Sequence, residues 1–120
     1  MPVNSQVSRS TRSTVLERLR ILRAILARAR DTLMHFKDDR VDRDRLEPAA
    51  RRVDGLMDMF ASNSSDPLLV ALWSGEIRSA IDGVPNPKSA AALREASAEL
   101  AAILGIIEAA EKVSRAGIGH

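Results

Sequence analysis

Few residues of this chain have side chains suited to catalysis or metal binding, and His35 is the first to consider. It lies between Met34 and Phe36, an apolar setting in which a histidine serves as a haem ligand or a general base. The chain has no Cys and no Tyr to accompany it. The Glu-x-x-His pairs of a di-iron bundle are also missing. We therefore interpret His35 as a histidine at the surface or at the edge of a core.

Four carboxylates crowd the segment from Asp38 to Asp44, "DDRVDRD". A calcium loop of the EF-hand type needs a glycine in its middle and a bidentate glutamate at its last position, and this segment has neither. Arginines also neutralise the cluster, so we interpret it as a solvated linker. Gly-rich phosphate loops and nucleophile elbows do not occur. These observations predict a protein that is not an enzyme and that has no cofactor and no metal.

The composition favours a helical protein. The 120 residues include one Trp, two Phe and no Cys, and alanine, leucine and arginine dominate. The longest apolar run, residues 101–107, is far shorter than the ~20 residues that a membrane span needs. The start of the chain has no apolar segment of the kind found in secretory signals. We expect a cytoplasmic protein without membrane association, and the preference for Ala and Arg suggests bacterial coding.

The strongest periodic signal is an apolar stripe predicting a first helix over residues 13–37, with Ser13 as its N-cap. Its positions advance by alternating steps of four and three residues, the spacing of a heptad repeat. They are Val15, Leu19, Leu22, Leu26, Ala29, Leu33 and Phe36. Residues 1–12 are polar and aperiodic, and we expect a flexible arm there.

Proline and glycine signals divide the remainder into three more helices, over about 47–61, 67–82 and 87–116. Asp66 followed by Pro67, and Asn86 followed by Pro87, each form a cap and a first-turn proline. Gly83 suits the residue after a helix. The fold class expected is all-α, an antiparallel four-helix bundle with long first and fourth helices and two short middle helices, forming a single domain over residues 13–117.

The charged residues beside the stripe indicate whether the first helix pairs with a second copy of itself or with another helix of the same chain. Three basic residues, Arg23, Arg30 and Lys37, flank its stripe, so two copies zipped along this helix would repel each other. The fourth helix instead offers Glu111, which can meet Arg23 or its neighbours when the two helices pair in opposite directions. We therefore expect the stripe to be an internal contact between the first and fourth helices.

The fourth helix is apolar beyond its own stripe, at Leu104, Ile106 and Val113. The two middle helices are too short to cover the two long ones along their whole length, since each residue adds ~1.5 Å to the length of a helix. This mismatch predicts a homodimer through the fourth helix, with these three residues as interface candidates. Trp73 is a fourth candidate, a hot spot for protein binding if it is exposed.

The arginines suggest an alternative role in nucleic-acid binding. Residues 1–52 carry a net charge of +6 and residues 53–120 a net charge of −4. The candidate phosphate contacts are Arg20, Arg23, Arg28, Arg30, Arg51 and Arg52. Aspartates interrupt the basic run, and no aromatic residues are interleaved for base stacking. The third helix carries only Arg78 as a base-reading cation, so it is a poor recognition helix.

Elimination of catalytic motifs and the surplus of apolar helix surface lead to one preferred function. We expect a small non-enzymatic protein that binds another protein, as an adaptor, secretion chaperone, anti-activator or assembly factor. The alternative is a nucleic-acid-associated accessory protein that uses the arginines of the first half.

Overall fold

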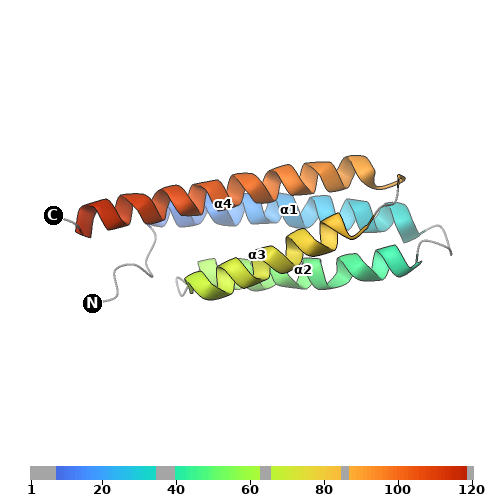
Figure 1. Cartoon of the computed structure of the whole chain (residues 1–120), viewed down its shortest axis with the longest axis horizontal. Helices are drawn as coiled ribbons and strands as arrows, with labels where there is room; N and C mark the ends of the chain where they lie inside the picture. Colours follow the sequence, from blue (N-terminus) through green and yellow to red (C-terminus); the bar gives the residue numbers. More distant parts are fainter. Residues whose placement is uncertain (1–7, 35–39, 63–65, 85–86, 119–120) are drawn as a thin grey trace.

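The computed structural model describes residues 8–34, 40–62, 66–84 and 87–118, and these form four α-helices without a strand among them. The helices are α1 (Arg9–Met34), α2 (Arg40–Ala61), α3 (Pro67–Asp82) and α4 (Ala90–Ile118). They lie along the long axis of an elongated molecule of 57 × 21 × 21 Å (Figure 1). The all-α prediction is confirmed.

The stripe predicted for the first helix is the central surface of the core. Its six members from Val15 to Leu33 are all fully buried or nearly so, while Phe36 lies outside the described residues. The helix begins at Arg9 rather than near Ser13, because the Ser8 hydroxyl accepts a hydrogen bond from the Thr11 backbone N–H at 3.2 Å. Part of the segment expected as an arm therefore belongs to α1, and residues 1–7 lie outside the described part.

Helix α2 is longer than the sequence pattern indicated, beginning at Arg40 instead of near residue 47. The charged segment interpreted as a linker thus supplies its first turns, and Pro48 lies inside the helix. Proline removes one backbone hydrogen bond, but its ring is exposed while Leu46 and Ala49 on either side are buried. Burial of that apolar stripe outweighs the local cost, and Arg45 donates to the Gly83 carbonyl oxygen at 2.7 Å, which ties α2 to the end of α3.

Helix α3 has the bounds that the capping residues predicted. The Asp66 carboxylate accepts a hydrogen bond from the Leu68 backbone N–H, Pro67 occupies the first turn, and Gly83 caps the end. Helix α4 begins at Ala90, slightly later than its proline signal indicated.

The packing of the helices is uneven around the molecule. Helix α1 packs against both α2 and α4, and α2 packs against α3, whereas α3 and α4 make a much smaller contact. Phe60, Leu19 and Leu100 are among the largest fully buried side chains. The stripe of α1 is therefore shared between two neighbours, not reserved for α4, and the boundary between α3 and α4 is the least closed part of the bundle.

Candidate protein-binding surface

The buried face of α3 differs from the predicted one. In the sequence, the helical spacing of Leu69, Trp73, Ile77 and Ala80 or Ile81 predicts that these residues face the core. The buried residues are instead Val70, Ser74, Ile77 and Ile81. The prediction was wrong for Leu69, which is 37% exposed. The sequence pattern did not indicate this face because Ser74, in the middle of it, is polar. The spacing of the large apolar residues favoured Trp73 at the neighbouring position instead.

Large apolar side chains of α3 lie in solvent. Leu68 is 80% exposed, Leu72 is 56% exposed, and both lie on the first half of the helix with Leu69 beside them. Isolated exposed leucines are ordinary on protein surfaces, whereas apolar groups gathered over successive helix turns are typical of interaction sites. No sequence signal distinguished these three residues, since every second residue or so of α3 is apolar.

Trp73 is held between α2 and α3. A Cβ at Gly55 would lie only 2.9 Å from its ring, so the absence of a side chain on α2 makes the space that the indole occupies. The Arg52 guanidinium lies 5.4 Å from the ring centroid and also pairs with Glu76. Trp73 is therefore partly buried and packs against the core, with one face of its ring covered by Arg52.

A pocket of about 320 Å³ lies where α3 and α4 approach each other. It is lined by Ala71, Ser74, Gly75 and Arg78 from α3 and by Leu104 from α4. The Ser74 hydroxyl is buried and has no hydrogen-bond partner within the described part of the chain. A buried hydroxyl without a partner is unusual in a folded protein.

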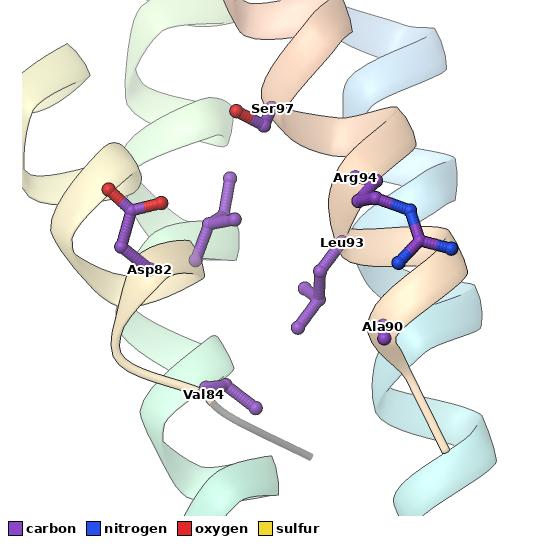
Figure 2. A pocket seen from close by; sticks show the side chains of 7 residues that line it. Asp82, Val84, Ala90, Leu93, Arg94 and Ser97 are labelled. Atoms are coloured by element: carbon purple, nitrogen blue, oxygen red, sulfur yellow. The ribbon is translucent and has the colours of Figure 1, made fainter. Parts of the chain in front are cut away.

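A second pocket, of about 260 Å³, lies nearer the turn that connects α3 to α4. Figure 2 shows Asp82 and Val84 on one side of it and Leu93 and Ser97 on the other. The Arg94 side chain extends away from the Asp82 carboxylate, and these two side chains form no ion pair in the described structure (Figure 2). The two pockets together show that α3 and α4 are incompletely packed at more than one level.

The interface candidates on α4 have mixed surroundings. Leu104 and Ile106 are partly buried against the core of their own chain, so they are only partly available to a partner. The side chain of Val113 lies outside what the structure describes. The exposed residues of α4 are of two kinds. Some are small, among them Ala98, Ala101, Gly105 and Ala109, and the others are the charged residues Arg94, Glu95, Glu108 and Lys112.

Most of the candidate arginines pair with carboxylates on other helices. Arg23 pairs with Asp54, not with the fourth helix as expected, Arg28 pairs with Glu95, Arg30 with Glu47 and Arg52 with Glu76. Arg18, which was not a candidate, pairs with Glu99. Arg20 and Arg51 are exposed and make no ion pair with another described residue. The opposite charges of the two halves therefore meet within the molecule.

No group of three or more histidine or acidic side chains suited to a metal ion occurs in the described ranges. His35 and the aspartates at 38 and 39 lie outside the described residues. Among the helices described, none has the length and apolar character needed to cross a membrane.

In comparisons with known proteins, no family model, no curated protein and no solved structure matches this chain.

Proposed function

We propose that this chain is a small non-enzymatic protein that binds another protein through the outer side of α3 and the adjoining pocket against α4. An antiparallel four-helix bundle is the scaffold in this proposal. The cross-helix ion pairs support that arrangement, because residues 18 and 28 of α1 pair with residues 99 and 95 of α4, in descending order. The roles that fit are those of a cytoplasmic adaptor, secretion chaperone, anti-activator or assembly factor.

The observation that carries the proposal is the exposure of Leu68, Leu69 and Leu72 beside an incompletely closed helix boundary. Covering a leucine side chain that is exposed to solvent stabilises a complex by roughly 1.5–3 kcal/mol before the costs of association. These three leucines, which lie on two consecutive turns, form an anchor of the kind that a partner helix or groove recognises.

Capture experiments with the full-length chain test this proposal. A tagged protein is incubated with a lysate of the cells that naturally express it, and bound proteins are compared between variants. Leu68→Ser combined with Leu72→Ser should abolish capture of the specific partner. Ile21→Ser is the matched control, because Ile21 is also a large exposed apolar residue, 45% exposed, but lies on α1.

Circular dichroism establishes that each variant remains helical. Equal loss of capture in the Ile21 control would contradict a specific site on α3. Retention of the same captured protein by the double variant would contradict it as well.

A homodimer through α4, the interface expected from the sequence, has weaker support than the surface on α3. Its support is the run of small exposed residues, which permits close approach of a second helix. The partly buried positions of Leu104 and Ile106 reduce the apolar area that this dimer would cover.

Nucleic-acid association is the second candidate function, and Arg20 and Arg51 are the residues that favour it. Both are exposed cations on neighbouring helices without an ion pair in the described structure. A gel-shift titration of a short DNA duplex at low and high salt tests it, with Arg20→Gln and Arg51→Gln expected to weaken binding and to reduce its salt dependence. Absence of binding at low salt would exclude this role.

A further inference from the structure

The outward side of α3 carries a pattern that the protein-binding proposal does not explain. Its residues at successive turns are Leu68, Leu72, Gly75 and Ser79, spaced by four, three and four residues. All four are exposed and lie opposite the buried face of the helix. The first half of this stripe is large and apolar, and the second half is small.

The small half of the stripe is also hollow. A Cβ added at Gly75 would meet nothing within 4 Å. A shallow, wide-open depression lies over Ala71, Leu72, Gly75, Glu76 and Ser79. The outer side of α3 therefore has a projection at one end and a depression at the other.

Such a surface is complementary to itself under two-fold symmetry. When two copies of α3 lie in opposite directions, Leu72 of one copy meets Gly75 of the other, and Leu68 meets Ser79. Each leucine then fills the space above a small residue. Both copies make the same contacts, because the symmetry axis lies between positions 72 and 75. A parallel pair would instead oppose leucine to leucine and leave the small half unfilled.

Charge does not decide between the two arrangements. Asp82, at the last turn of α3, lies in the two-fold pair near the first turn of the opposing α3, but the Asp66 carboxylate already caps that helix N-terminus. Glu76, which lies at the edge of the stripe, is paired with Arg52.

From this shape we infer that the outer side of α3 binds a second copy of this chain, forming an antiparallel two-fold pair of α3 helices. The inference rests on the proposed function, since it names the partner of the same surface, and it places self-association on α3 rather than on α4. A helix of 16 residues provides a contact only about 24 Å long. The dimer is therefore weak and depends on protein concentration.

Sedimentation equilibrium over a range of concentrations measures the association. Matched substitutions at Gly75 on α3 and Gly105 on α4 then show which of these two helices forms the interface. Gly75 and Gly105 both lie within helices, and a Cβ at either position has open space around it. Gly75→Leu should weaken dimerisation about tenfold or more, because the new side chain occupies the space that Leu72 of the other copy fills. Gly105→Leu should leave the dimerisation constant unchanged, and both variants should be at least as stable as the parent.

Cross-linking locates the contact directly. The chain has no cysteine, so Gly75→Cys and Gly105→Cys each introduce a single thiol. A short bismaleimide should join two copies of the Gly75→Cys variant and not of the Gly105→Cys variant. The reverse result would place the dimer on α4 and overturn this inference.

Other outcomes separate the two proposals. A chain that stays monomeric at every concentration, while Leu68→Ser with Leu72→Ser still abolishes capture of a different protein, overturns the α3 dimer and leaves the proposed function intact. A monomer that also captures no partner overturns both.

Discussion

The close approach of α2 and α3 at Gly55 leads to a prediction about the sign of one substitution. Replacing glycine by alanine inside a helix normally stabilises a protein by about 0.5–1 kcal/mol, because glycine loses more backbone freedom on folding. At Gly55 the added Cβ would lie 2.9 Å from Cζ3 of Trp73, whereas carbon atoms in good contact lie about 3.5–4.0 Å apart. The indole is rigid and has Arg52 over one face, so relief requires that α2 and α3 separate.

The magnitude follows from these two opposing effects. Overpacking of this kind costs about 1–3 kcal/mol. After the gain from removing glycine, we expect Gly55→Ala to lower the free energy of unfolding by about 1 kcal/mol. Gly105→Ala is the matched control, because it lies in a helix with nothing within 4 Å of its Cβ, and it should raise the free energy of unfolding by about 0.5–1 kcal/mol.

Urea denaturation followed by far-ultraviolet circular dichroism measures both variants at one low protein concentration. The difference of about 2 kcal/mol between them corresponds to roughly 8 °C in Tm. In a Trp73→Leu background the obstacle is gone, and Gly55→Ala should become stabilising. If Gly55→Ala stabilises the parent as much as Gly105→Ala does, the packing argument for Trp73 against α2 is refuted.

Three further substitutions test the core, a helix cap and the surface charges. Phe60→Ala should lower the free energy of unfolding by about 3–5 kcal/mol in a denaturant titration, because the side chain is 1% exposed and leaves a cavity; a loss below 1 kcal/mol would contradict its place in the core. Asp66→Ala should cost about 1 kcal/mol in thermal unfolding, because the Leu68 backbone N–H loses its acceptor, and Asp66→Asn should recover most of that loss. Arg18→Ala should cost no more than about 1 kcal/mol, because the pair with Glu99 is partly exposed, and a double-mutant cycle in low and high salt should show the coupling energy falling with salt.

The sequence alone was sufficient for the helical class, the stripe of α1 and the bounds of α3. Those features depend on local chemistry: the spacing of apolar residues, the Asp66 side chain at a helix start, and the fixed backbone angle of Pro67. Local chemistry was misleading at the start of α2. The charged residues before Pro48 have no apolar period of their own. Contacts with other helices hold that segment, because Leu46 is buried and Arg45 donates to the Gly83 carbonyl oxygen.

The candidate surface depended on tertiary structure. Periodicity alone cannot fix how far a helix is turned about its axis when apolar residues occupy most of its circumference, as they do in α3. That angle is decided by which side chains fit the neighbouring helix: Gly55 on α2 makes space for Trp73, and Ser74 is small enough to lie in the core. The same rotation leaves Leu69 37% exposed beside Leu68 and Leu72, two residues that the predicted face also leaves outside the core. The arginines also depended on tertiary structure. Their number and charge are evident from the sequence, but only the fold brings Arg23, Arg28 and Arg30 to carboxylates distant in the chain.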